Sequence, residues 1–401
     1  MSNNKRKEIL SKILLICLGI IIALVIVEFP LRFLNLRPFE NILIAHPIYH
    51  HALVPNAKAI EVGPVDSEYK VFHDINKWGF RGGFYPKHKE KDVFRILMLG
   101  DSFTQGLGVE DDETFSRQLE TFINTAGAKK RIEVLNMGLI SYSPTLEHLV
   151  FKNIGIDFNP DLVVLNFDMS DIQDEYKYSK YHIKNNGGDI ISVRPGEFDG
   201  IIGMLFCVDQ ELIKKSVSYC YLRVPFQRLY DRVNKWRKKI KRWYHKKVLK
   251  DWIKKDWITI GDIKTDRYAI LRDEVYPEIE PYWQLSFSAI KKIDSITIAN
   301  NIEFVLAVYP YGHQISPREW GKGRTDWHFD KDRVYASTYP FDRLRKFSKD
   351  NNITFLSAKK AFLDSKEYPL FFDFDGHFTP LGHKLYAKTL YDFLRRNHLI
   401  P

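Results

Sequence analysis

Runs of apolar residues alternate with amphipathic stretches over most of the chain, and their order predicts the core of the fold. Phe94–Gly100, Ile132–Asn136 and Leu162–Phe167 are strand-like runs, separated by stretches with helical spacing. The pattern resumes with a predicted helix over 285–300, a strand over 303–308, a helix over 341–350, a strand over 353–356 and a last helix over 380–396. Strands that alternate with helices are typical of a parallel sheet covered on both faces.

The N-terminal segment is apolar in a different way, without any amphipathic pattern. Ile13–Val27 is uninterrupted by charge, and Ile9–Phe29 reaches the roughly 20 residues that span a bilayer. No small-residue cleavage site follows and Cys17 lacks a lipobox, so we expect an uncleaved, unlipidated transmembrane anchor rather than a signal peptide or a buried core helix. The basic residues before it predict a cytoplasmic N-terminus and a single-pass protein whose remaining chain is extracytoplasmic. These are Lys5, Arg6, Lys7 and Lys12.

These patterns divide the chain into five parts. We expect a cytoplasmic stub and anchor over 1–36, an irregular covering segment over 37–92, the two parts of the α/β core over 93–175 and 280–401, and a basic helical insertion over 176–279.

Composition and charge refine this division. With 401 residues, 45% of them hydrophobic, the chain has ample material for a core, and its three cysteines exclude a disulfide framework. Cys207 and Cys220 could pair in an oxidising compartment or stay as two buried thiols. The net charge of +10 is concentrated between Arg223 and Lys255, where 14 Lys and Arg face two Asp, so the rest of the chain is slightly acidic.

The basic region reads as one amphipathic helix with indole rings along Leu229–Trp252. It could lie on a membrane surface, or its apolar stripe could pack on the core with solvated lysines outside. Nucleic acid is disfavoured as a partner, because the anchor's orientation places this helix outside the cytoplasm.

Candidate chemistry begins at Gly100-Asp101-Ser102-Phe103, directly after the first core strand. A serine there has its hydroxyl at the carboxyl edge of the sheet, where open α/β folds bind their ligands. Such a hydroxyl needs a base to take its proton and a third group to orient that base. Without them, Ser102 would be a cap or turn residue, and Asp101 is expected to organise the loop rather than to react.

A base is available near the other end of the chain. Asp375-Gly376-His377 places a carboxylate two residues before a histidine, in a loop before the last helix, which Pro380 begins well. Asp373 is a second candidate for the carboxylate. We read His383 as a helix residue and the cluster of His46, His50 and His51 as surface residues, and we expect no metal or other cofactor.

Together these motifs resemble the SGNH/GDSL-type serine hydrolases, in the membrane-anchored bacterial form with an Asp-x-His last block. The resemblance runs from the anchor through Asn76–Gly82 to the C-terminus but leaves out the insertion. It implies a flavodoxin-like three-layer α/β/α sandwich and acyl-ester hydrolysis or transfer. The absence of Gly-x-Ser-x-Gly argues against the α/β-hydrolase nucleophile elbow, and no phosphate-binding loop is present.

The sequence departs from the family at two oxyanion positions. Ser141 stands where the second block has glycine, and Ser170 stands where the third block has asparagine. A backbone N–H survives the first change, whereas a hydroxyl reaches less far than an amide in the second. Losing one oxyanion donor costs on the order of a hundred- to thousandfold in rate, unless a neighbour such as Asn166 replaces it.

The resemblance implies a role for each residue. His377 takes the proton of Ser102, Asp375 orients His377, and the N–H groups of Ser102 and Ser141, helped by Ser170, hold the oxyanion. The expected activity is that of a serine esterase or O-acyltransferase on acyl, above all O-acetyl, esters of envelope glycans. The altered oxyanion positions leave open a non-catalytic relative that binds polysaccharide or assembles an export complex. The anchor and basic helix leave open a lysophospholipase.

Overall fold

The computed structural model describes residues 3–65, 68–195, 209–223, 279–327 and 329–401. Its core is one parallel sheet of five strands in the order β12-β11-β8-β6-β7. The strands are β6 (Val93–Leu99), β7 (Arg131–Asn136), β8 (Leu162–Phe167), β11 (Glu303–Val308) and β12 (Thr354–Ser357). Counted in chain order this is 2-1-3-4-5, the flavodoxin-like arrangement, and it confirms the predicted fold class.

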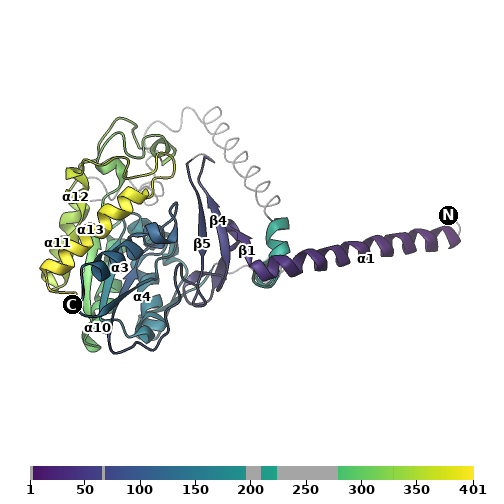
Figure 1. Cartoon of the computed structure of the whole chain (residues 1–401), viewed down its shortest axis with the longest axis horizontal. Coiled ribbons are helices and arrows are strands. Elements are labelled where there is room, and N and C mark those ends of the chain that lie inside the picture. Colours follow the sequence, from purple (N-terminus) through teal and green to yellow (C-terminus); the bar gives the residue numbers. More distant parts are fainter. Residues whose placement is uncertain (1–2, 66–67, 196–208, 224–278, 328) are drawn as a thin grey trace.

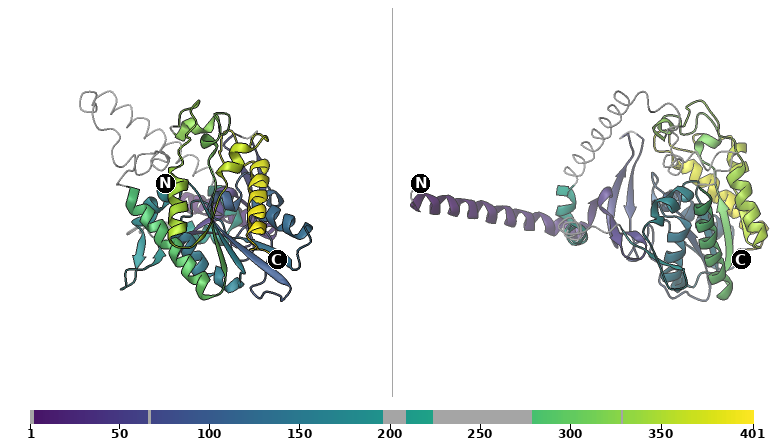
Figure 2. Two further views of the ribbon diagram at one scale, coloured as in Figure 1. Left: turned by 90° about the vertical axis from the view of Figure 1, so that its left-hand side faces the viewer. Right: turned by 180° about the vertical axis from the view of Figure 1, so that it is seen from behind.

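Helices cover both faces of this sheet, as the apolar runs require. On one face α10 (Glu280–Ala299) packs on α4 (Pro144–Asn153) and α5 (Asp171–Ser179), and α11 (Tyr339–Asp350) joins them through the stacked rings of Phe287 and Phe347. On the other face α13 (Pro380–Arg396) packs on α3 (Phe115–Thr125) and α12 (Lys359–Asp364). Figures 1 and 2 show the sheet between the two layers. All six residues of β8 are buried, because this strand lies in the middle of the sandwich.

The covering segment is more regular than expected, so the prediction of an irregular stretch over 37–92 is wrong. It holds a three-stranded sheet in the order β1-β4-β5 and a separate hairpin of β2 and β3. The strands are β1 (Leu36–Pro38), β2 (Leu43–His46), β3 (His50–Leu53), β4 (Lys58–Val62) and β5 (Lys70–Asp74). In β4 and β5 exposed and buried residues alternate, which is the period of a half-buried strand. Each run is too short to stand out in the sequence.

The insertion is only partly described. Helix α5 crosses its predicted start, and β9 (His182–Lys184) and β10 (Ile190–Val193) then form an antiparallel hairpin, so the described part is not wholly helical. The predicted basic helix over Leu229–Trp252 and Cys207 lie outside the described residues. Cys220 is buried and carries a free thiol.

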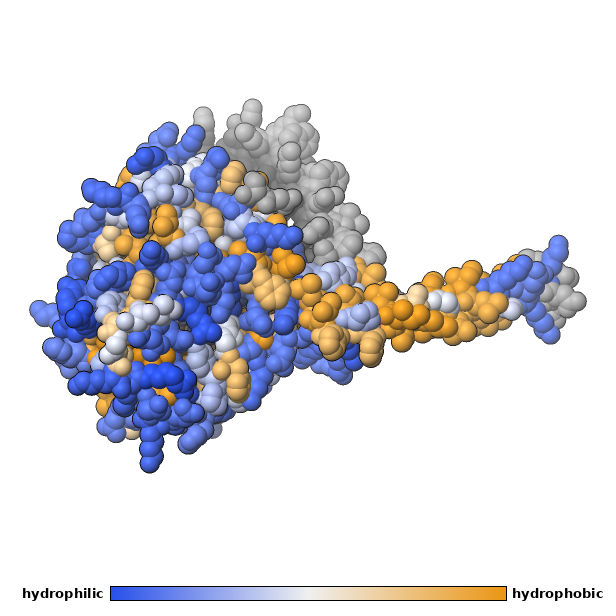
Figure 3. All heavy atoms as spheres, in the orientation of Figure 1, coloured by the Kyte–Doolittle hydropathy of each residue, from blue (hydrophilic) through white to orange (hydrophobic). Residues whose placement is uncertain are grey.

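Helix α1 (Asn3–Leu34) projects from the rest of the molecule as a single rod (Figure 1). Its segment Lys7–Leu34 is long and apolar enough to cross a membrane. The most apolar 18 residues of this segment have a mean hydropathy of 3.0, and none of them is buried. Figure 3 shows the apolar surface of this rod standing clear of the mixed surface of the core. At its base Glu28 accepts hydrogen bonds from the backbone of Val217 and Ser218, at 3.0 and 2.8 Å, which joins the insertion to the helix.

Candidate active site

Ser102 lies at the carboxyl end of β6, on the short helix α2 (Ser102–Gln105). Gly100 makes the turn possible: its φ is 155°, and a Cβ there would lie 2.0 Å from Thr104 Oγ1. Asp101 then caps α2 by accepting a hydrogen bond of 2.9 Å from the N–H of Phe103. The turn and cap fix the Ser102 side chain at the edge of the sheet, as the sequence led us to expect.

The loop before α13 brings a histidine and a carboxylate to the same edge. His377 Nε2 lies 2.8 Å from Ser102 Oγ, and His377 Nδ1 hydrogen-bonds the Asp375 carboxylate. Asp373 turns away and pairs with Lys322 at 2.9 Å. The hydrogen-bonded chain therefore runs from Ser102 through His377 to Asp375, and Asp373 is not part of it.

Burial and charge set the protonation states of this chain. Burial disfavours the charged form of His377, but the Asp375 carboxylate outweighs burial and raises the pKa of His377 to about 9. Burial would raise the pKa of Asp375, yet the neighbouring His377 holds this pKa below its usual value. The pair therefore favours an imidazolium next to a carboxylate, which is the charge state that a base reaches after taking a proton.

Residues of the covering segment hydrogen-bond the Asp375 side chain and the backbone next to it. Tyr69 donates a hydrogen bond of 3.1 Å to Asp375 Oδ2, and its hydroxyl also lies 3.3 Å from Glu61 Oε1. The Glu68 carboxylate accepts from the backbone N–H groups of Phe374 and Asp375, at 2.7 and 3.1 Å. Strand β4 and the loop before β5 thus contact the site as well as covering the core.

Ser141 and Ser170, which the sequence suggested as oxyanion residues, line the same cleft as Ser102, His377 and Asp375. Ser141 follows β7 and has a φ of 57°, which explains why a glycine would suit this position. Ser170 precedes α5, and its N–H donates to Asp168 Oδ1 at 2.5 Å. Asn166 does not line the cleft, because its amide donates to Leu99 O at 2.8 Å and its Oδ1 accepts from Tyr386 at 2.8 Å. Asn166 therefore does not replace the missing donor.

The loop that carries Ser141 packs directly on α2. A Cβ on Gly138 would lie 2.5 Å from the backbone nitrogen of Gln105, so only glycine allows this approach. Asn136, at the end of β7, donates to Thr104 O at 2.6 Å and accepts from Gly138 N at 3.0 Å. These contacts fix the position of the Ser141 loop relative to Ser102.

A cleft of about 430 Å³ opens over Ser102, His377 and Asp375. Its walls combine polar and aromatic side chains. The lining residues are Asp101, Ser102, Phe103, Ile140, Ser141, Ser170, Gln173, Asp174, Lys177, Tyr311, Trp320, Asp375, Gly376 and His377. Lys177 is the exposed residue of this set.

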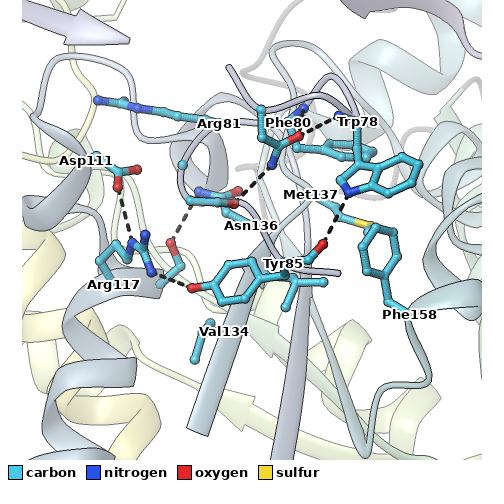
Figure 4. A pocket seen from close by; sticks show the side chains of 15 residues that line it. Trp78, Phe80, Arg81, Tyr85, Asp111, Arg117, Val134, Asn136, Met137 and Phe158 are labelled. Atoms are coloured by element: carbon cyan, nitrogen blue, oxygen red, sulfur yellow. Dashed lines mark hydrogen bonds and ion pairs between the residues drawn. The ribbon is translucent and has the colours of Figure 1, made fainter. Parts of the chain in front are cut away.

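A second, much smaller pocket is lined in part by Asn136 and contains neither Ser102, His377 nor Asp375. Figure 4 shows Trp78 and Tyr85 of the covering segment beside Asn136 and Arg117 of the core, with Tyr85 bonded to Arg117. Trp78 donates to Tyr85 O at 3.2 Å and packs edge-on against Phe158. This pocket marks where the Asn76–Gly82 motif docks on the sheet.

The remaining histidines are placed differently from our expectation. His383 lies in α13 as predicted and accepts from Phe115 N at 3.2 Å. His51 is only 6% exposed, and His46 and His50 are half-buried, so the reading of these three as surface residues is wrong. The hairpin of β2 and β3 folds them against Tyr49, Tyr142 and Tyr178. Within the described residues no group of three or more His, Cys, Asp or Glu is arranged to hold a metal ion.

Sequence reasoning missed several residues that shape the site. Tyr309 donates to Asp101 Oδ1 at 3.2 Å, and Tyr311 donates to Asp168 Oδ1 at 2.6 Å. Both tyrosines follow β11 at the carboxyl edge, so their position after a strand was an available signal. Burial, followed by the nearby Asp168, raises the pKa of Asp101 well above its usual value. No comparable signal was available for Glu68, Tyr69 and His51, because nothing in the sequence indicates that these residues contact the core.

Comparisons with known proteins complete the description. No protein-family model and no curated protein matches the sequence. Solved structures that resemble it include a GDSL-like lipase from Bacteroides thetaiotaomicron, with 12% identity over 78% of this chain and 93% of that one and a TM-score of 0.36. A catalytic mutant of an acetylxylan esterase from Geobacillus stearothermophilus is similar at 12% identity, over 77% of this chain and 96% of that one, with a TM-score of 0.37.

Proposed function

We propose that the chain is a membrane-anchored serine esterase of the SGNH type, acting on acyl esters, above all O-acetyl esters, of envelope glycans by hydrolysis or acyl transfer. The observation that carries this proposal is the hydrogen-bonded chain of Ser102, His377 and Asp375 in an open cleft. A hydroxyl beside an imidazole that is itself oriented by a carboxylate is the arrangement of an activated nucleophile.

The first half of the reaction forms an acyl-enzyme. His377 Nε2 takes the proton of Ser102 as Ser102 Oγ attacks the ester carbonyl carbon, and Asp375 stabilises the resulting imidazolium. The backbone N–H groups of Ser102 and Ser141, with the Ser170 hydroxyl, donate to the oxyanion. The C–O bond to the alcohol then breaks, the leaving oxygen takes the proton from His377, and the acyl group stays on Ser102.

The second half returns the enzyme to its starting state. Water or a sugar hydroxyl gives its proton to His377 while its oxygen attacks the acyl carbon. The bond to Ser102 breaks, and Ser102 recovers the proton from His377. Water as the acceptor gives a free acid, and a sugar hydroxyl gives a new ester.

The lining of the cleft favours a glycan ester over a long-chain lipid. Binding a fatty acyl chain needs an apolar wall, worth about 0.8 kcal/mol per buried CH₂, and Ile140 is the aliphatic side chain among the residues that line the cleft. Gln173, Asp174 and Lys177 supply polar atoms instead, next to the rings of Tyr311 and Trp320. Polar groups that orient a ligand beside aromatic walls suit a sugar with a small acyl group.

We infer that the N-terminal helix anchors this activity to a membrane. Helix α1 is long and apolar enough to span a bilayer, and basic residues precede its apolar segment, so we infer a cytoplasmic N-terminus and an extracytoplasmic catalytic domain. The test is protease treatment of intact cells or spheroplasts that express the chain. External protease should cleave the domain, which should resist extraction from membranes by alkaline carbonate. A domain protected from external protease would overturn this topology.

The activity is tested with the full chain in detergent. We expect acetate release from acetylated xylan or a similar acetylated glycan to exceed fatty-acid release from lysophospholipid micelles. Ser102→Ala should lower the rate by three or more orders of magnitude, as expected when a nucleophile is removed. Ser295→Ala, which changes an exposed serine on α10, is the matched control and should keep full activity. Equal rates for wild type and Ser102→Ala would overturn the proposal, and preferred lipid cleavage would favour a lysophospholipase.

The second candidate is a non-catalytic relative that binds polysaccharide or assembles an export complex. Ser141 and Ser170 favour it, because both stand where the family has other oxyanion residues. It predicts that Ser102→Ala complements a deletion of the gene as well as wild type does. A loss of complementation by a folded Ser102→Ala protein would exclude it.

A further inference from the structure

The peptide group that joins Ile140 to Ser141 is held from its carbonyl side by a buried histidine. His51 Nε2 lies 2.8 Å from Ile140 O. A carbonyl oxygen can only accept, so Nε2 carries the hydrogen and donates it. His51 belongs to β3 of the covering segment, 89 residues before Ile140 in the chain.

Holding the carbonyl also fixes the N–H on the other side of the same peptide. The peptide group is planar and trans, so its C=O and N–H point in opposite directions. The N–H of this group belongs to Ser141, which lines the cleft beside Ser102. A hydrogen bond to the carbonyl also polarises the group and makes its N–H a better donor.

The neighbouring atoms prevent this peptide from turning over. Ile140 N donates to Gln105 Oε1 at 2.8 Å, which ties the residue to the helix of the nucleophile. Ser141 has the left-handed φ of 57°. The Ile140–Ser141 peptide group is therefore fixed on both sides, and His51 is the donor to its carbonyl oxygen.

His51 is in turn held in one orientation and one tautomer. Its Nδ1 lies 3.0 Å from His50 Nδ1, and because Nε2 has the hydrogen, Nδ1 accepts and His50 donates. Tyr142 donates to the backbone oxygen of His51 at 2.8 Å, and the two rings meet edge to face. Burial lowers the pKa of His51 to about 3, so the ring is neutral at physiological pH. A neutral ring keeps one donor and one acceptor, as this chain of contacts requires.

We propose that His51 is a positioning residue of the active site, which aims the Ser141 N–H at the oxyanion by holding the carbonyl of the Ile140–Ser141 peptide. The inference rests on the proposed esterase function and deepens it. It gives the covering segment a part in transition-state stabilisation that the sequence motifs do not assign.

The test compares His51→Phe, which keeps an aromatic ring without a donor, with His51→Gln, which keeps an N–H donor. Removing a whole oxyanion donor costs about a hundred- to thousandfold in rate, so a misaimed donor should lower kcat by about ten- to a hundredfold. KM should change less than about twofold, because the loss falls on the transition state. His51→Gln should recover part of the lost kcat.

Two controls separate this role from plain stability. His46→Phe changes a half-buried histidine of the same hairpin, which accepts from Ile48 N and Tyr49 N and should leave kcat unchanged. All rates are divided by the folded fraction, measured by near-ultraviolet circular dichroism. Wild-type kcat in a folded His51→Phe protein, or equal losses in the Phe and Gln variants, would overturn the proposal while the esterase function stands. An inactive wild type would overturn both. If His51→Phe does not fold, the comparison of His51→Gln with wild type decides. The proposal predicts a kcat below that of wild type at an unchanged KM. An unchanged kcat would contradict the proposal.

Discussion

His377 Nε2 and Ser102 Oγ lie 2.8 Å apart, although 275 residues separate them in the chain. The first is in the loop before the last helix and the second follows the first strand of the core sheet. Because parallel strands end at one edge of the sheet, the fold brings both groups to the same cleft.

The pH profile should follow His377. Proton transfer needs the neutral imidazole, and the pKa of this group is raised from 6.5 to about 9, so kcat/KM should rise with pH and level off above about pH 9. The raised pKa of His377 also stabilises the folded state. This contribution to the free energy of unfolding is complete below pH 6.5 and is lost as the pH rises through 9. Asp375→Asn should shift the rising part of the pH profile to lower pH and reduce the maximal kcat/KM. If kcat/KM of the wild type instead rose with a midpoint near pH 6.5, the coupling of His377 to Asp375 would be contradicted.

Ser141 should be needed for its backbone rather than its side chain. Ser141→Gly and Ser141→Ala keep the N–H, and both should retain activity within about threefold of wild type. Ser141→Pro removes the N–H and requires a φ near −65° in place of 57°, so kcat should fall by a hundredfold or more, on the order of one lost oxyanion donor. Full activity in a folded Ser141→Pro protein would show that another group holds the oxyanion.

Tyr69 should stabilise the Asp375 carboxylate from the covering segment. Tyr69→Phe removes one donor to Asp375. Hydrogen bonds to charged groups contribute about 1.5–3 kcal/mol, so the free energy of unfolding should fall by about that amount and kcat should fall as well. Tyr391→Phe on α13 is the matched control and should change neither. The measurements are thermal unfolding and steady-state kinetics, and an unchanged melting temperature for Tyr69→Phe would argue against this support.

Asp101 should act as a neutral cap. Burial, followed by Asp168, raises its pKa well above the usual value and so disfavours the charged form, and the amide of Asp101→Asn keeps the shape of the carboxyl without its charge. We expect Asp101→Asn to lower the free energy of unfolding by less than about 1 kcal/mol and Asp101→Ala by about 1–2 kcal/mol, the usual range for a lost N-cap. Denaturant unfolding at neutral pH measures both values. A larger loss for Asn than for Ala would mean that the carboxylate is ionised.

The sequence predicted the core well because its signals are local and strong. Four of the five core strands are mostly buried apolar runs, and β12, at the edge of the sheet, is half-buried. Helix α13 begins at Pro380 and ends at Arg396 as expected. The edge of the sheet where Ser102 and His377 meet followed from one rule about parallel strands. Asp375 could not be separated from Asp373 in this way, since only the folded loop turns Asp373 toward Lys322.

The strands of the covering segment could not be predicted, because their signals in the sequence are weak and depend on distant contacts. Its strands have three to five residues, and three of the five side chains in each of β4 and β5 are exposed. Their apolar pattern is therefore weak, and burial comes from contacts far away in the chain. His51 is an example, because it looks like a surface histidine until Ile140 and Tyr142 enclose it.

The most direct test of the account is labelling with a fluorophosphonate, which reacts with an activated serine hydroxyl, followed by mass spectrometry of the digested protein. The account predicts one adduct, on the peptide that contains Ser102, and loss of labelling in Ser102→Ala and His377→Ala but not in Ser295→Ala. A folded wild type that takes up no label, or a label that persists in Ser102→Ala, would contradict it.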